Sequence, residues 1–189
     1  MESYHDNTEF IGEDFSEKEW GKVEFEDCSF KDCHFTNSNL SDIKFINCEF
    51  VNCDMSNAKL QTTSFQDAFF KDCKLMGLLF SDCNPFLLEM KFHHCNLKLS
   101  SFYKMKLKET PFESCNLSEV DFTESNLEKA VFSNCDLSGA VFEDTVLLKA
   151  DFRSSSNYLI SLEHNQIKGA SFSLQNIGGL LQGYGIHIE

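Results

Sequence analysis

The residues of this chain that could carry chemistry are its thiols and imidazoles. It has nine cysteines and six histidines, and the densest group is His93-His94-Cys95. Zinc prefers such ligands, commonly with two of them in a CxxC pair, and no CxxC pair occurs. Successive side chains of an extended chain point to opposite sides, so His94 and Cys95 cannot easily share one ion. We therefore predict no metal site.

The cysteines do not suggest a disulfide framework either, because an odd number cannot pair completely. The first residues, MESYHDNTEF, are acidic and polar and do not resemble a signal peptide. No apolar run approaches the length of a membrane span. These features predict a cytoplasmic protein that has reduced cysteines and no membrane contact.

Two carboxylate pairs, Glu13-Asp14 and Glu143-Asp144, are the remaining candidates for proton transfer. No nucleophile elbow or phosphate loop accompanies them. We predict no catalytic residue, no enzymatic activity and no cofactor. The net charge of −14 argues against direct nucleic-acid binding, which requires basic surface. It favours a basic protein partner, or a protein that normally holds DNA.

The elements that would position these side chains follow from a repeat of five residues. Large apolar residues recur at this spacing from Phe10 to Phe80, resume at Phe92 after two extra residues, and continue more weakly to Phe172. Steps of five give no single stripe on an α-helix, and on a flat strand they alternate between faces. The chain must therefore turn a corner every five residues, and four corners close a coil of 20 residues.

Stacking such coils predicts an all-β fold, a quadrilateral parallel β-helix, in which coils lie roughly 4.8 Å apart. It would comprise residues 1–172, interrupted by a bulge at 84–91. One face would carry a column of phenylalanines that forms the structural core: Phe10, Phe30, Phe50, Phe70, Phe92, Phe112, Phe132, Phe152 and Phe172. Small residues dominate the slot two positions before each inward residue, and most cysteines occupy it. A free cysteine behaves as a small hydrophobe, so we predict that these thiols pack in the interior.

The sequence of residues 173–189 predicts a short helical cap followed by a tail. Ser173 can cap the N-terminus of a helix, and the open end of a solenoid needs a cover. This cap is either folded onto Phe172 or shared across a two-fold axis, because the alternating ending also suits a pairing strand. The second interpretation predicts a homodimer whose interface contains Leu174, Ile177, Leu180, Leu181, Tyr184, Ile186 and Ile188.

The bulge holds four consecutive residues that are apolar or proline, namely Pro85, Phe86, Leu87 and Leu88. At least one of them should fill the fourth-face position that the two extra residues displace. The rest form either a tolerated insertion packed on the rod or a loop that binds a partner.

The run CNLSEVDFTESNLEKAVFSNCDLSGAVF, residues 115–142, resembles the pentapeptide-repeat family, with its A/C/S-D/N-L/F-x-x unit. The resemblance covers residues 8 to 172 and implies a right-handed quadrilateral β-helix. The single interruption and the ending SLQNIGGLLQGYGIHIE are similar to the Qnr and MfpA group of that family. That narrower resemblance implies dimers joined at their C-termini, a rod like B-form DNA in size and charge, and binding to DNA gyrase and topoisomerase IV with protection from quinolones. The chain lacks the longer projecting loops of Gram-negative Qnr proteins, and Gly178, Gly179 and Gly183 weaken a terminal helix.

Charge is spread unevenly along the predicted rod. Residues 1–85 hold 17 acidic and 7 basic residues, and residues 86–189 hold 13 and 9. Five lysines form a basic patch near the middle: Lys91, Lys98, Lys104, Lys106 and Lys108. Over a rod of roughly 40 Å, the net charge amounts to about one per 3 Å, within a factor of about two of the density of DNA. The alternatives to DNA mimicry are an acidic scaffold for an unrelated protein partner, or acidity that serves solubility alone.

Overall fold

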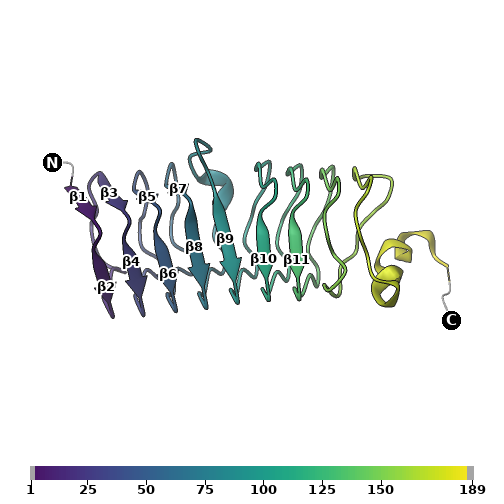
Figure 1. Cartoon of the computed structure of the whole chain (residues 1–189), viewed down its shortest axis with the longest axis horizontal. Coiled ribbons are helices and arrows are strands. Elements are labelled where there is room, and N and C mark those ends of the chain that lie inside the picture. The colour runs from purple at the N-terminus through teal and green to yellow at the C-terminus, as the bar shows by residue number, and fades with distance from the viewer. Residues whose placement is uncertain (1–2, 187–189) are drawn as a thin grey trace.

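A computed structural model describes residues 3–186 of the chain. It is a rod of stacked coils, with one end of the chain at each end of the rod (Figure 1). The predicted parallel β-solenoid of pentapeptide repeats is confirmed, and every strand pairing in it is parallel. None of the described helices is long and apolar enough to cross a membrane.

Two faces of the rod carry named strands, and the others are linked by isolated β-bridges. The four-stranded sheet, on the face of Phe25 and Phe45, contains β1 (Ser3–Asp6), β3 (Val23–Glu26), β5 (Lys44–Ile46) and β7 (Ser64–Gln66). The seven-stranded sheet contains β2 (Glu9–Ile11), β4 (Ser29–Lys31), β6 (Glu49–Val51), β8 (Ala68–Lys71), β9 (Met90–His93), β10 (Pro111–Glu113) and β11 (Val131–Ser133).

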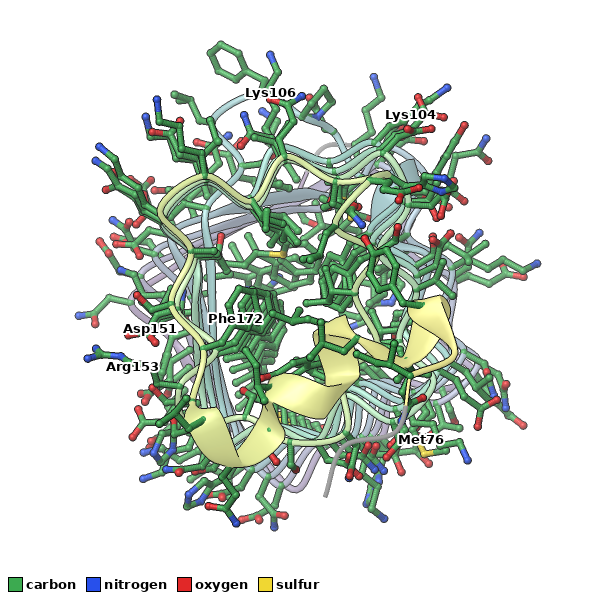
Figure 2. The ribbon with its side chains drawn as sticks, turned by 90° about the vertical axis from the view of Figure 1, so that its right-hand side faces the viewer. Met76, Lys104, Lys106, Asp151, Arg153 and Phe172 are labelled. Atoms are coloured by element: carbon green, nitrogen blue, oxygen red, sulfur yellow. The ribbon has the colours of Figure 1, made fainter. Side chains whose placement is uncertain are left out.

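The phenylalanine column lies along the seven-stranded sheet. Phe30 pairs with Phe50 in register, and this step repeats from Phe10 to Phe172, with ring centroids 4.6–5.4 Å apart in stacked geometry. Rings on neighbouring faces meet edge to face, as Phe25 meets Phe30 at 5.2 Å. Figure 2 views the rod along its axis and shows Phe172 at the end of this interior column. The aromatic side chains thus fill the bore as one continuous core.

The corners depend on the residue two positions after each inward side chain. This residue has a positive φ at nearly every corner, as at Asp32 (55°) and Asn52 (52°). Asn, Asp and Gly tolerate this left-handed region best, and they occupy most corners of the first four coils. Later corners hold Leu99, Lys104 and Lys129. These residues adopt the same left-handed conformation, although it is less favourable for their side chains.

The bulge follows η1 (Phe80–Asp82), a short 3-10 helix, and loops out from the rod before β9 (Figure 1). It restores the register with an offset of 22 residues, because Phe70 pairs with Phe92. Among residues 85–88, Leu88 is the one that packs against the core, where it is half-buried, and Met90 at the end of the bulge is fully buried. The solenoid therefore accepts the insertion without breaking its sheet.

The C-terminal cap consists of two 3-10 helices, η2 (Leu174–Leu180) and η3 (Gln182–Tyr184), and η2 lies across the end of the bore (Figure 2). Ser173 accepts a hydrogen bond from the Asn176 N–H, as predicted for an N-cap. The last coil departs from the expected pattern at Asn157, whose positive φ (60°) turns the fully buried Tyr158 into the core instead.

Candidate functional site

The cysteine slot is an interior position with a second role besides packing. All nine cysteines are free and buried. The Cys53 Sγ lies 3.3 Å from the carbonyl oxygen of Phe30 in the preceding coil, and the Cys73 Sγ lies 3.3 Å from that of Phe50. Some hydroxyls in the same slot donate to the same kind of acceptor, as Thr63 does to Leu40 at 2.8 Å, whereas the hydroxyls of Ser38 and Ser125 have no partner. The slot therefore requires a small side chain, and several of its occupants also donate to a carbonyl. The sequence pattern indicated the size but not the donor.

Burial makes Cys48 and Cys83 poorly suited to chemistry, whereas side-chain hydrogen bonds with Cys135 and Cys95 lower the pKa of the buried Cys115 thiol. Burial raises the pKa of Cys48 to about 12, from an ordinary value of 9.0. Burial also raises the pKa of Cys83. A thiol must ionise to act as a nucleophile or a metal ligand, and Cys48 and Cys83 stay neutral at physiological pH.

The histidine cluster lies beside carboxylates of adjacent coils. The rings of His93 and His94 stack at 4.1 Å, and each lies near a carboxylate of an adjacent coil, Glu113 at 3.8 Å and Asp72 at 3.4 Å. Among residues 3–186, no three His, Cys, Asp or Glu side chains converge as a metal site would require. The arrangement gives the imidazoles a structural role between coils.

The predicted partner-binding residues of the bulge fall into two groups. Phe86 and Leu87 are 66% and 63% exposed, and Pro85 is exposed as well. Leu88 is half-buried. The Phe86 N–H donates to the Asn84 side chain at 3.0 Å, which fixes the start of the turn. The bulge thus presents two adjacent apolar side chains to solvent on a rod whose outer surface is otherwise mostly polar.

The basic patch in the middle of the rod is largely paired with acids on neighbouring coils. Lys91 lies 2.6 Å from Asp67, and the ion pairs of Lys98, Lys104 and Lys108 measure 3.1–3.3 Å. In Figure 2, Lys104 and Lys106 project outward from one side of the rod. These pairs lower the local positive charge that the sequence count suggested.

Several carboxylates in the first coils are held by neutral donors instead. Asp27 accepts a hydrogen bond from Asn47 at 3.2 Å, and Asp32 accepts one from Asn52 at 2.6 Å. Asp42 accepts the hydroxyl of Thr62 at 2.5 Å. An amide or hydroxyl fixes a carboxylate in place without cancelling its charge. These coils therefore present ordered negative charge at their corners.

The predicted dimer residues lie at the C-terminal end, but on different sides of the cap. Leu180 is buried, and Ile177 and Leu181 are half-buried against the core. Leu174, expected on the same face, begins η2 and is 90% exposed. Tyr184 and Ile186 are about half exposed, at 48% and 53%, and Ile188 lies outside the described residues.

Beside the cap runs a groove of about 500 Å³. Val141, Leu159 and Tyr184 are three of the side chains that line it, and each is about half exposed. The cap thus covers the bore and still leaves apolar surface around itself.

Comparison with known proteins identifies the family and structures with a similar fold. A family model described as the pentapeptide repeat region matches residues 23–85, 43–114 and 105–180. No curated protein sequence matches the chain. The crystal structure of HetL, a pentapeptide repeat protein involved in heterocyst differentiation regulation in the cyanobacterium Nostoc sp. strain PCC 7120, is similar with a TM-score of 0.69 and 16% identity. That match covers 91% of this chain and 88% of HetL.

A trypsin-treated form of QnrB1, a plasmid-mediated fluoroquinolone resistance protein, matches with a TM-score of 0.49, 19% identity and full coverage of both chains. At such identities the likeness concerns the fold alone. The family itself is shown by the model matches, which span most of the chain. The chain belongs to the pentapeptide-repeat family.

Proposed function

We propose that this protein is a non-enzymatic DNA mimic that binds a type II topoisomerase, DNA gyrase or topoisomerase IV, and modulates it or protects it from quinolones. The observation that carries the proposal is the ordered negative charge of the first coils. Asp27, Asp32 and Asp42 sit at three of four successive corners of the rod, with Asn37 between the last two, and neutral donors fix all three carboxylates. A protein that holds DNA has a basic channel, and rigid carboxylates on a narrow rod suit such a channel.

The sequence resemblance to the Qnr and MfpA group supports the same proposal, since it implies that partner. The pairing of the mid-rod lysines also supports it. Lys98, Lys104 and Lys108 are occupied by acids of the next coil, so they oppose a basic partner less than free lysines would.

Supercoiling and cleavage assays with the gyrase of the same organism test the proposal. The purified chain should inhibit supercoiling, or reduce quinolone-stabilised DNA cleavage, at micromolar concentration or below. The effect should weaken as salt rises, because exposed charges beyond a Debye length of about 8 Å at physiological ionic strength are screened. No effect on gyrase or topoisomerase IV at any salt concentration would contradict the proposal.

A pair of matched variants tests which coils are responsible. Asp27→Asn with Asp32→Asn removes two fixed charges, and asparagine suits the positive φ of both corners. Asp144→Asn with Glu163→Gln removes two charges near the other end. The first variant should weaken the effect on gyrase at least tenfold, and the second should change it less than twofold. Equal effects would show that net charge alone matters.

An alternative function, a scaffold for an unrelated protein partner, is favoured by one observation. Phe86 and Leu87 expose apolar surface side by side on the bulge. A pull-down that recovers a protein other than a topoisomerase, and loses it when both residues are replaced by serine, would support this alternative.

We also propose that two copies join end to end through the C-terminal cap. Leu174, Tyr184 and Ile186 leave more apolar surface than closing one bore requires. This end-to-end dimer would double the length of the acidic rod.

A further inference from the structure

The first coil ends the core with a layer of aromatic rings. His5 stacks on Phe25 at 4.9 Å, Phe10 on Phe30 at 4.9 Å, and Phe15 on Phe35 at 4.8 Å. Trp20 takes the fourth inward position and packs against Phe15. Phe10 and Trp20 remain half-buried, because no coil of residues 3–186 lies beyond them. The outer side of this layer is therefore a partly open aromatic surface.

The chain covers part of this surface with a cation of its own. The ammonium of Lys18 lies 4.2 Å from the ring centroid of Trp20 and 5.1 Å from that of Phe15. A cation over a ring face is attracted by the ring quadrupole. The same chemistry applies to Phe10 and His5, which Lys18 does not reach in the described contacts. This half of the layer suits a further cation.

A carboxylate stands next to these rings in a position that faces the bore. Glu13 occupies the slot that Cys33 and Cys53 fill in the next two coils, as the twenty-residue register requires. Unlike those buried thiols, Glu13 is exposed at the end of the rod. A carboxylate beside an aromatic face is complementary to a guanidinium, which can stack and donate two hydrogen bonds at once.

The backbone at this end is an open strand edge. β1 and β2 are the terminal strands of their sheets within the described residues. The N–H groups of Ser29 and His34 donate to Thr8 and Glu13 of the coil before, at 3.0 and 2.9 Å. The equivalent N–H groups twenty residues earlier, those of Glu9 and Asp14, face the side on which no described coil lies. Such an edge can pair with an extended segment.

The negative charge at this end of the rod favours a basic segment as the binding partner. The first coil has two lysines, Lys18 and Lys22, and many more acidic residues. The acidic residues include Asp6, Glu9, Glu13, Asp14, Glu17 and Glu19. A second copy would bring the same negative end against this one, and like charges there repel. Glu9 already pairs with Lys31 of the next coil, but a segment without basic residues would bring no cation to Glu13.

We propose that the first coil binds an extended, arginine-rich segment of a partner protein, which adds a strand beside β2 (Glu9–Ile11). Arginines on the inner face of this strand stack over Phe10 and His5 and donate to Glu13. The backbone of the segment accepts a hydrogen bond from the N–H group of Glu9, on the same face of the rod as Phe10. This site does not depend on the DNA mimicry proposed above, which uses corner carboxylates on the sides of the rod.

The test uses a synthetic peptide of about eight residues that alternates arginine and threonine, so that its arginines share one face of a strand. Trp20 is the single tryptophan of the chain, and it lies in the layer where the peptide would bind. Titration should change its fluorescence, with a matching dissociation constant from calorimetry. A peptide with proline in place of threonine keeps the charge but cannot pair as a strand, and it should bind at least tenfold more weakly. Equal binding of both peptides would overturn strand addition.

Two variants locate the site. Glu13→Gln with Asp14→Asn should weaken peptide binding at least tenfold. Glu143→Gln with Asp144→Asn makes the same change in the same dipeptide at the far end, and it should leave binding within twofold of the unmodified chain. Phe10→Leu keeps an apolar side chain in the column and should weaken binding severalfold. The proposal fails if both carboxylate variants weaken binding equally, or if sedimentation shows that this end joins two copies.

Discussion

At the scale of single residues, the corners of the rod are the positions with the clearest energetic signature. Nearly every corner has a left-handed backbone, which costs an ordinary residue about 1–2 kcal/mol. The column of corners that contains Asn57 and Gly77 continues with Leu99, whose φ is 62°. Leu99 is 53% exposed, so its side chain gains little from packing. The residue therefore accepts strain with little compensation.

Replacing Leu99 with asparagine should stabilise the protein. Asparagine tolerates the left-handed region, so part of that strain of about 1–2 kcal/mol is relieved. The thermal midpoint should rise by roughly 2–4 °C for each kcal/mol gained. The reverse change in the same column, Asn57→Leu, should lower the midpoint by a similar amount. Calorimetry on both variants checks the sign, and a lower midpoint for Leu99→Asn would contradict the account of the corners.

The buried thiols give a prediction about pH. Burial raises the pKa of Cys48 from 9.0 to about 12, so the folded protein keeps this proton where the unfolded chain has lost it. The stabilisation is fully present below pH 9 and is lost as pH rises toward 12. The unfolding free energy from denaturant titration should therefore fall between pH 9 and 11, and less steeply in Cys48→Ala. Parallel curves for the two proteins would exclude a contribution from this thiol.

At the scale of elements, the C-terminal cap depends on one close approach. A Cβ atom on Gly179 would lie 2.1 Å from the carbonyl oxygen of Tyr158 and 2.8 Å from its ring. The Gly179 carbonyl also accepts the Ile160 N–H at 3.1 Å. Glycines weaken η2 as a helix, but one of them, Gly179, allows η2 to pack closely against the last coil.

Gly179→Ala should therefore loosen the cap. Overpacking of this kind costs about 1–3 kcal/mol, and the amide of Ile160 should exchange its hydrogen faster. Gly183→Ala is the matched control, because a Cβ there would meet no atom within 4 Å. If both alanine variants unfold at the same temperature, the cap is not seated through Gly179.

The sequence predicted the rod well because its largest side chains report the register directly. The spacing of phenylalanines gave the 20-residue coil and the two-residue excess before Phe92. Tyr158 escaped prediction, because a corner at Asn157 shifts the chain by one residue, and the spacing alone does not reveal it. The hydrogen bonds from the thiols of Cys53 and Cys73 to backbone carbonyls were not predicted either, because small size and apolarity already explained cysteine at those positions.

The candidate surfaces were harder to predict, because outward side chains follow no period. A count of charges located the lysines of the middle coils but not their partners. Lys104 pairs with Glu124 because the coils bring residues 20 apart together, and this depends on side-chain direction as well as register. Leu174 was expected on the same buried face as Ile177, yet it lies exposed at the start of η2.

At the scale of the whole molecule, the two ends of the rod differ in character. The N-terminal end carries the excess of carboxylates, and the C-terminal end carries exposed apolar side chains. Association through the acidic end would bring like charges together, whereas association through the other end would bury Leu174, Tyr184 and Ile186. The two ends of the rod therefore differ, and self-association through the C-terminal end is favoured over association through the N-terminal end.

We expect the chain to sediment as a dimer at micromolar concentration and to dissociate on dilution. Leu174→Asp should yield a monomer, because the 90% exposed side chain contributes to the joint without supporting the fold of one copy. Phe86→Asp adds the same charge to another exposed apolar residue, on the bulge, and should leave the dimer intact. Sedimentation at two concentrations separates these outcomes, with circular dichroism to verify folding. A monomer at both concentrations for the unmodified chain would mean that the cap closes a single rod. The acidic surface would then act at the length of one copy.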